Sequence, residues 1–289
     1  MEYITLKERI LSYYLSVFLL ERNIMNNIKL ISFDLDGTIL KDSKLSKAVI
    51  EAFHKLENKG IMLVVNTGRS IDSLYEMFDL LKLSGKNNYA ILTTGAVVQN
   101  IDTRKIIKHF SLSLDDYRHI RKNVDSRYNL SVYTPDKLYY VDEIFPEIVE
   151  DNEILLMEME KFSEDKDIEI SRVNIMGSKE KLDEFEKLHN KEFLNDYYFV
   201  RTIPISIEIL NKNASKGNGL KAFMEELNIL PSEAIAIGDG NNDISMFEVV
   251  EHSVAMGNAS DLVKSHAKYV TDSIDDDGFV KMLEMFKLI

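Results

Sequence analysis

The stretch that decides the fold is residues 28–38, IKLISFDLDGT, in which an apolar run leads directly into two carboxylates. The run Ile28–Phe33 is typical of a buried strand, and Gly37 marks the turn that ends it. Asp34 and Asp36 lie two positions apart, so an extended backbone would direct both side chains to one side. Open α/β sheets bind ligands in the crevice outside the carboxyl ends of their strands. The stretch therefore predicts an acidic site at one edge of a parallel sheet.

Two carboxylates this close together repel one another unless a cation or a shared proton relieves them. Their pairing favours a hard divalent cation, Mg²⁺, beside a carboxylate that is free to attack phosphorus. The alternative for Asp36 and Gly37 alone is an ordinary acidic turn after a strand. Other segments of the chain must decide between the two interpretations.

Apolar runs alternate with helical patterns at both ends of the chain. Strands are expected at residues 28–33, 61–65, 89–93, 205–210, 234–237, 253–256 and 268–271, and helices at 46–58, 71–83, 216–227, 243–250 and 279–287. Such βαβ alternation is typical of a parallel sheet with helices on its faces. We therefore expect an α/β protein with a doubly wound, Rossmann-like core.

A different pattern interrupts this alternation. Residues 105–203 predict helices at 112–128, 146–162 and 178–190 and strands at 130–133, 138–141, 170–176 and 197–203. We interpret this block as an inserted α+β domain between two parts of the core, 25–104 and 204–289. Residues 1–24 are expected to form a helical N-terminal extension.

Composition excludes several classes of function. The 289 residues include 35 basic and 48 acidic side chains, a net charge of −13, which argues against general nucleic-acid binding. The absence of cysteine excludes disulfides, thiolate metal sites and cysteine nucleophiles, and it suits a cytoplasmic location. The apolar segment 10–20 is too short to cross a bilayer, which takes about 20 residues, so no stable membrane insertion is expected. A peripheral membrane contact stays open, and composition leaves the oligomeric state open too.

Three further polar segments follow predicted strands. Thr67-Gly68-Arg69 offers a hydroxyl and backbone N–H groups at a strand-to-helix turn, which suits an anion cradle. Lys216 begins a predicted helix, where its charge opposes the helix dipole, so it needs another role such as neutralising a phosphate or orienting Asp34. Alone, the first segment could be an ordinary helix cap and the lysine could be solvated.

The third segment is the loop GDGNND at residues 238–243, which follows the predicted strand 234–237. Asp, Asn and Gly are also the usual residues of plain turns. This loop, however, would place Asp239 beside an aspartate pair that already needs a cation. Four such segments at strand ends, in the order Asp-x-Asp, Thr, Lys, Asp, make coincidence improbable.

With these motifs the sequence resembles the haloacid dehalogenase-like phosphohydrolases, specifically the Cof-like branch with a large cap between the second and third motifs. The resemblance covers residues 27–105 and 204–289 and is weak in the inserted block. It rests on Asp34-Leu35-Asp36-Gly37-Thr38, Thr67-Gly68-Arg69, Lys216, residues 238–246, residues 254–259, residues 269–271, and Asp277-Gly278. Thr94 departs from the branch, which usually has asparagine there, and this puts substrate contacts in doubt.

The resemblance implies a role for each of these residues. Asp34 would be the nucleophile, and Asp36 the general acid and base, whose backbone carbonyl also ligates Mg²⁺. Asp34 and Asp239 would supply carboxylate ligands to the metal. Leu35 (through its N–H), Thr67, Gly68, Lys216 and Asn242 would bind the phosphoryl oxygens, with Thr38, Arg69 and Asp243 in support.

The implied function is a Mg²⁺-dependent phosphatase that hydrolyses small phosphorylated metabolites, either sugar phosphates or cofactor phosphates, through an aspartyl-phosphate. The inserted domain would act as a cap that excludes water and selects the leaving group. Tyr139, Tyr140, Arg172 and Asn174 are candidate cap contacts, although each could be an ordinary strand residue. A phosphosugar mutase and a phosphometabolite-binding protein without turnover are the alternatives; the intact Asp34, Asp36, Lys216 and Asp239 argue against the second.

Overall fold

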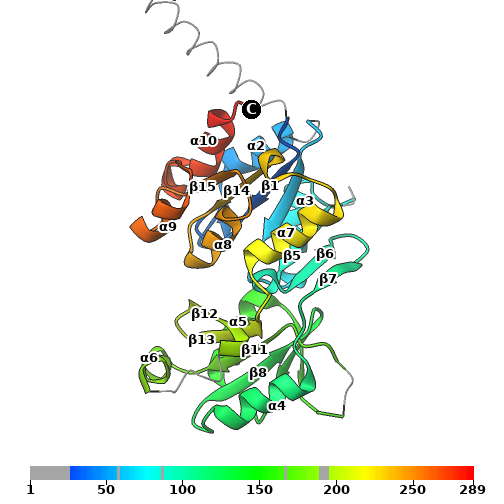
Figure 1. The fold of residues 1–289 in the computed structure, drawn as a ribbon, viewed down its shortest axis with the longest axis vertical. Coiled ribbons are helices and arrows are strands. Elements are labelled where there is room, and N and C mark those ends of the chain that lie inside the picture. The colour runs from blue at the N-terminus through cyan, green and yellow to red at the C-terminus, as the bar shows by residue number, and fades with distance from the viewer. Residues whose placement is uncertain (1–26, 57–58, 86–87, 166–167, 189–194) are drawn as a thin grey trace, which may run out of the picture.

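The computed structural model describes residues 27–56, 59–85, 88–165, 168–188 and 195–289, which form two units, each with its own sheet (Figure 1). The predicted N-terminal extension lies outside these residues. Among the residues described, none of the helices has the length and apolar character needed to cross a membrane.

The core contains an eight-stranded sheet in the order β16-β15-β14-β1-β4-β5-β6-β7. Strand β1 is central and pairs in parallel with β14 and β4, so that Leu30 lies opposite both Ala234 and Met62. The strands are β1 Leu30–Phe33, β4 Met62–Asn66, β5 Tyr89–Leu92, β6 Val97–Asn100, β7 Ile106–His109, β14 Ala234–Gly238, β15 His252–Ala255 and β16 Tyr269–Val270. The predicted α/β class with a parallel, Rossmann-like core is confirmed.

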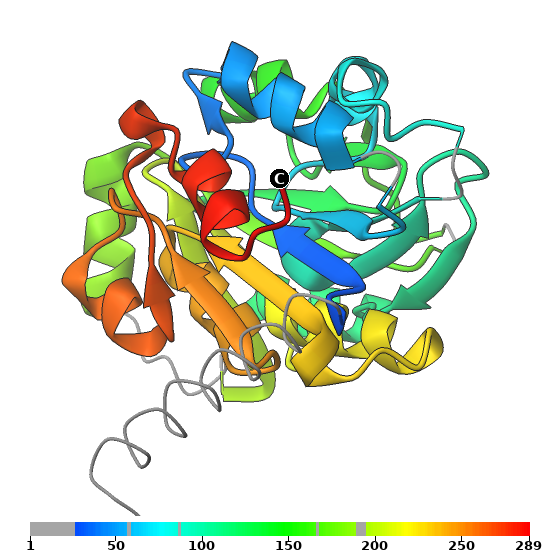
Figure 2. The ribbon, with the colours of Figure 1, turned by 90° about the horizontal axis from the view of Figure 1, so that it is seen from above.

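Helices cover both faces of the core sheet, because successive residues of a buried strand point to opposite faces (Figure 2). Ile31 and Phe33 belong to one apolar cluster, and Leu30 belongs to the other. The ring of Phe33 packs edge-on against Phe53 and Phe279, with centroids 5.3 and 5.8 Å away. The first face carries α2 Lys47–Leu56, α3 Tyr75–Leu80 and α10 Gly278–Met285, and the second carries α7 Lys216–Glu226, α8 Ile244–Phe247 and α9 Asp261–His266.

The second unit, which we call the cap domain, contains a six-stranded sheet in the order β10-β9-β8-β11-β13-β12. Its strands are β8 Asn129–Tyr133, β9 Lys137–Tyr140, β10 Glu158–Lys161, β11 Arg172–Met176, β12 Tyr197–Ile203 and β13 Ser206–Asn211, and its helices are α4 Leu114–Asn123, α5 Pro146–Leu155 and α6 Lys179–Leu188. A short hairpin, β2 Leu40–Lys41 and β3 Lys44–Leu45, projects from the core. Single 3₁₀ turns complete the elements: η1 Asp72–Leu74, η2 Thr93–Gly95, η4 Pro231–Glu233, η5 Asn241–Asp243 and η6 Ile274–Asp276.

Several elements differ from the sequence predictions. The helix expected at 146–162 ends as α5, because Leu156 adopts a left-handed conformation with φ 54°, and strand β10 follows it. The helix expected at 71–83 is the turn η1 followed by the short α3, and α9 was not predicted.

One predicted strand belongs to a different sheet from that expected, and one core strand was not predicted. The strand predicted at 205–210 is β13, which pairs with β11 and β12 in the cap instead of opening the second part of the core. Strand β7 extends the core sheet beyond residue 104 by pairing with β6. The chain therefore crosses between the sheets after His109 and after Asn211. An apolar run identifies a strand but does not specify its partner, so the boundaries 104/105 and 203/204 could not be placed more accurately.

We predict that Gly217→Ala destabilises the protein because Gly217, in the first turn of α7, lies against α8. A Cβ there would come within 2.0 Å of the Ser245 carbonyl oxygen, whereas a Cβ on Gly177 would meet only ordinary contacts at 3.6 Å. Overpacking of this kind costs about 1–3 kcal/mol. Urea denaturation should show that loss for Gly217→Ala and much less for Gly177→Ala. Equal stability of the two variants would mean that α7 and α8 are not packed this closely.

Candidate active site

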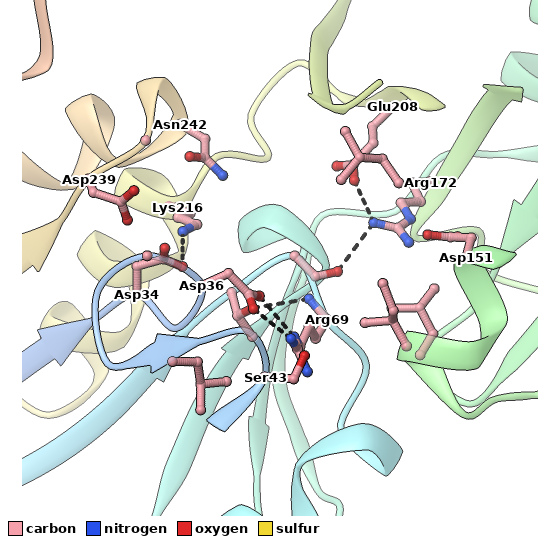
Figure 3. A pocket seen from close by; sticks show the side chains of 18 of the residues that line it. Asp34, Asp36, Ser43, Arg69, Asp151, Arg172, Glu208, Lys216, Asp239 and Asn242 are labelled. Atoms are coloured by element: carbon pink, nitrogen blue, oxygen red, sulfur yellow. Dashed lines mark hydrogen bonds and ion pairs between the residues drawn. The ribbon is translucent and has the colours of Figure 1, made fainter. Parts of the chain in front are cut away.

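A pocket of about 530 Å³ lies between the carboxyl ends of the core strands and the cap domain (Figure 3). Its volume falls within the roughly 300–1,000 Å³ typical of small-molecule sites. The lining residues are Asp34, Asp36, Gly37, Leu40, Asp42, Ser43, Thr67, Gly68, Arg69, Asp151, Ile154, Leu155, Arg172, Ile203, Glu208, Lys216, Asp239, Gly240 and Asn242. The structure thus brings residues of all four predicted motifs to one cavity.

A buried ammonium group lies at the centre of the core side of this pocket. The Nζ atom of Lys216 is 2.5 Å from Asp34 Oδ1 and 2.7 Å from Asp243 Oδ1, and the lysine is 1% exposed. Asp34 follows directly on β1, where its N–H donates to the Ile237 carbonyl. Because one cation faces two carboxyl groups, Lys216 cannot neutralise both when they are ionised.

Local hydrogen bonds hold Lys216 at the start of α7. Ser215 caps the helix by accepting a hydrogen bond from the Asn218 N–H at 3.1 Å. Asn66, at the end of β4, donates from Nδ2 to the Lys216 carbonyl oxygen at 3.0 Å. These contacts fix a positive charge at a helix N-terminus, where the dipole disfavours it, and the two aspartates offset that cost.

The acidic residues around the lysine fit a divalent cation. Asp34, Asp239 and Asp243 each offer a carboxylate oxygen within 4.8 Å of the others. Asp243 is already engaged, since Oδ1 accepts from Lys216 and Oδ2 accepts from the N–H groups of Asp239 and Gly240. Asp34 and Asp239 are therefore the carboxylates best able to hold a metal, and such an oxygen-rich, negatively charged donor set suits Mg²⁺.

Burial dominates the electrostatics of these carboxyl groups. Desolvation raises the pKa of Asp34 to about 8; the nearby Lys216 opposes the rise, and Asp243 adds to it. Desolvation and the charge of Asp243 also raise the pKa of Asp239 to about 6. Burial would lower the pKa of Lys216, but Asp243 and Asp34 reverse the shift, so the lysine remains charged. A bound cation would relieve the same repulsion that raises the pKa values of Asp34 and Asp239.

Asp36 is held differently from Asp34, although both line the pocket. Arg69 forms a bidentate ion pair with its carboxylate: Nε donates to Oδ2 at 2.9 Å and Nη2 donates to Oδ1 at 2.5 Å. The Asp36 side chain is 55% exposed, whereas that of Arg69 is 14% exposed. In this arrangement Asp36 forms no hydrogen bond with Lys216, Asp34 or Asp243. Its pairing with Arg69 was not predicted from the sequence.

The residues expected to bind phosphate lie at different depths. Thr67, Gly68 and Asn242 line the pocket with Lys216. Leu35 is fully buried and is not among the lining residues. Thr38 donates to Asp239 Oδ1 at 2.9 Å, which orients that carboxylate.

The cap side of the pocket was only partly foreseen. Of the four candidate cap contacts, Arg172 lines the pocket, whereas Tyr139, Tyr140 and Asn174 are not among the lining residues. The residues that sequence reasoning missed on this side are Asp151, Ile154, Leu155, Ile203 and Glu208, and on the core hairpin Leu40, Asp42 and Ser43. The i, i+3, i+4 spacing of 151, 154 and 155 on a helix, and a lone glutamate within the apolar run ISIEIL, were the available signals.

Buried polar contacts join the cap to the core beside the second motif, Thr67-Gly68-Arg69. Arg172 donates from Nη1 to Glu208 Oε1 at 2.8 Å and to the Gly68 carbonyl at 3.2 Å. Thr94 donates to Glu208 Oε2 at 2.7 Å. Thr93 and Thr94 have φ values of 51° and 54°, a conformation that is rare for β-branched residues and that the surrounding contacts must maintain. The threonine at position 94, where the family branch usually has asparagine, therefore affects the cap–core junction.

Comparisons with known proteins agree with this geometry. A family model described as haloacid dehalogenase-like hydrolase matches residues 31–283. YcsE of Bacillus subtilis, named a 5-amino-6-(5-phospho-D-ribitylamino)uracil phosphatase, is 30% identical over 272 residues, covering 91% of this chain and 97% of that protein. Phosphatase YwpJ of the same organism is 28% identical, covering 89% and 99%. A solved haloacid dehalogenase-like hydrolase from B. subtilis has a TM-score of 0.75 at 27% identity, covering 89% and 99%.

The raised pKa values predict that the metal-free protein loses stability as pH rises. Asp34 and Asp239 keep protons in the folded state that the unfolded chain releases near pH 4, so their contribution is present below pH 4 and is lost through about pH 6 and pH 8. The free energy of unfolding in excess chelator should fall by at least ~1 kcal/mol between pH 5 and 8. Asp34→Asn should weaken this dependence, and a flat profile for the unmodified protein would contradict the prediction.

Proposed function

The chain belongs to the haloacid dehalogenase-like hydrolases, and we propose that it is a Mg²⁺-dependent phosphatase that hydrolyses small phosphorylated metabolites, sugar or cofactor phosphates, through an aspartyl-phosphate on Asp34. The observation that carries the proposal is the buried Lys216 ammonium, bonded to both Asp34 and Asp243 at the floor of the pocket. Lys216 fixes Asp34 in place, while Asp239 lies close enough to share a cation with it.

In the first step, an oxygen of the Asp34 carboxylate forms a bond to phosphorus as the bond to the leaving oxygen breaks. The carboxyl group of Asp36 donates its proton to that leaving oxygen. In the second step, a water attacks the phosphorus of the aspartyl-phosphate, and Asp36 takes back a proton from it. Free phosphate leaves and Asp34 is regenerated as a carboxylate.

Asp36 must leave Arg69 before it can serve as the acid. In their ion pair both carboxylate oxygens of Asp36 accept hydrogen bonds from the guanidinium, so neither is available to the leaving oxygen. Arg69 is a cation beside the pocket, so an arriving phosphoryl group can compete for its guanidinium. Substrate binding would in this way free Asp36 when its proton is needed.

The remaining site residues would position and neutralise the phosphoryl group. Thr67, the N–H groups of Gly68 and Leu35, Lys216 and Asn242 are the proposed donors to its oxygens. The carboxylates of Asp34 and Asp239 and the backbone carbonyl of Asp36 would hold the metal, which would supply positive charge to offset the negative charge of the phosphoryl oxygens.

The relative YcsE supports a small substrate, since its name specifies a phosphorylated ribityl compound. A mutase on the same scaffold would return the phosphoryl group to the sugar instead of to water. Incubation with a hexose 1-phosphate distinguishes the two: we expect free phosphate, whereas accumulation of the 6-phosphate would overturn the hydrolase assignment.

Asp34→Asn should reduce phosphate release from p-nitrophenyl phosphate by at least ~1,000-fold, because an amide cannot form the aspartyl-phosphate. Asp261→Asn, at an exposed carboxylate in α9, is the matched control and should retain turnover. The measurement is phosphate release at saturating substrate with circular dichroism to verify folding. Undiminished turnover by a folded Asp34→Asn variant would refute the covalent mechanism.

Mg²⁺ should stabilise the protein more at pH 8 than at pH 5.5, because binding requires ionised Asp34 and Asp239, whose pKa values are raised. Thermal unfolding with and without Mg²⁺ measures this difference, and Asp239→Asn should abolish most of it. Excess chelator should also abolish phosphate release. Full activity in chelator would exclude the metal assignment.

A further inference from the structure

The cap wall of the pocket contains a buried carboxyl group that the proposed chemistry does not use. Asp151, in the last turns of α5, is 7% exposed and lines the pocket together with Ile154 and Leu155. Ser70 of the core donates to the Leu155 carbonyl oxygen at 2.5 Å, which seats this end of α5 beside the second motif. Figure 3 places Asp151 across the pocket from Asp34 and Lys216. A substrate whose phosphoryl group sits at Asp34 would therefore direct its leaving group toward Asp151.

The hydrogen bonding of Asp151 is incomplete. The buried hydroxyl of Tyr133 donates to Asp151 Oδ2 at 2.6 Å, and no other hydrogen bond to this side chain is found among the described residues. A carboxylate can accept about four hydrogen bonds, so Asp151 retains capacity for a donor from a ligand. Burial raises its pKa, while Arg172 and the Tyr133 hydroxyl act in the opposite direction.

Arg172 offsets the charge of Asp151 only in part, because its ion pair is with Glu208. Its Nη1 donates to Glu208 and to the Gly68 carbonyl, and its guanidinium lies 4.2 Å above the Tyr133 ring, whereas Nε is buried without a hydrogen-bond partner among the described residues. Asp151 faces this guanidinium in Figure 3 but forms no ion pair with it. The charged residues on the cap side of the pocket are thus one cation and two carboxylates, a net charge of −1.

The end of α5 adds to this negative character. Asp151 precedes the C-terminal residue Leu155 by one turn, and a helix C-terminus carries partial negative charge. A second anion entering here would meet the net negative charge of Asp151, Glu208 and Arg172 together. A hydroxyl or amino group would instead find an acceptor.

Building on the proposed phosphatase function, we propose that Asp151 determines specificity by accepting a hydrogen bond from a hydroxyl or amino group of the leaving group. The pocket then takes phosphate esters of polyols and amino sugars, and it rejects leaving groups that carry a carboxylate or a second phosphate.

Two esters of equal length test this directly. Sorbitol 6-phosphate and 6-phosphogluconate differ at the far end of the chain, where one has a CH₂OH group and the other a carboxylate. We expect kcat/KM for the polyol to exceed that for the acid by at least ~10-fold in the unmodified protein, mainly through KM. A ratio at or below one would overturn the proposal, and this holds even if no variant can be purified.

Asp151→Asn keeps the shape of the side chain and removes its charge. It should lower the ratio of polyol to acid by at least ~10-fold, partly by improving turnover of 6-phosphogluconate. Glu150→Gln, the exposed neighbour on α5, makes the same charge change away from the pocket and should leave the ratio unaltered. If Asp151→Asn scales both esters and p-nitrophenyl phosphate by one common factor, Asp151 is merely structural and the proposal fails.

The two proposals fail in different ways. Absence of phosphate release from every ester, including p-nitrophenyl phosphate with Mg²⁺, would overturn the phosphatase function. Release from p-nitrophenyl phosphate without a preference for the polyol would overturn only the role of Asp151.

Discussion

The structure depends on one buried ammonium group between two aspartates. Lys216 joins the end of β1, the start of α7 and the loop after β14, which are widely separated in sequence. Without the lysine, Asp34 and Asp243 would be buried as unpaired carboxylates, and without them the lysine would be a buried charge at the wrong end of a helix. Each group is tolerable only because the others are present. The same contacts that close the fold at this edge of the sheet therefore also assemble the site.

Much of the core could be predicted from sequence because its strands are short apolar runs that end in polar residues. In Phe33/Asp34 and Val65/Asn66 a polar side chain directly follows an apolar strand residue, and parallel strands bring such ends together. The pattern did not predict β7, and it could not assign β13 to its sheet, since pairing depends on distant partners. It also missed the Arg69–Asp36 pair, because both side chains looked like independent members of separate motifs.

The cap residues that line the pocket were harder to predict from sequence for a related reason. Asp151 lies in an acidic helix and Glu208 in an apolar strand, and the local signals, helical spacing and a lone glutamate, do not show that the two residues face a shared cavity. Their significance arises from Arg172, which engages Glu208 and the Gly68 carbonyl of the second motif while facing Asp151. One guanidinium thus links the wall proposed to meet the leaving group to the loop proposed to bind the phosphoryl group. A substitution in the cap wall would therefore alter the position of the loop, and a substitution in the loop would alter the cap wall.

The two crossings between the sheets lie next to each other: Asn211 donates from Nδ2 to the Ser111 carbonyl oxygen at 2.8 Å. The inserted cap therefore begins and ends at this one hydrogen-bonded junction, and β1, β4, β14 and α7 all lie in the core. A foreign insertion whose two ends are equally close could be grafted at this point without altering the spacing of the catalytic strands. Such modularity would allow the cap domain to be replaced in evolution while the core domain stays unchanged.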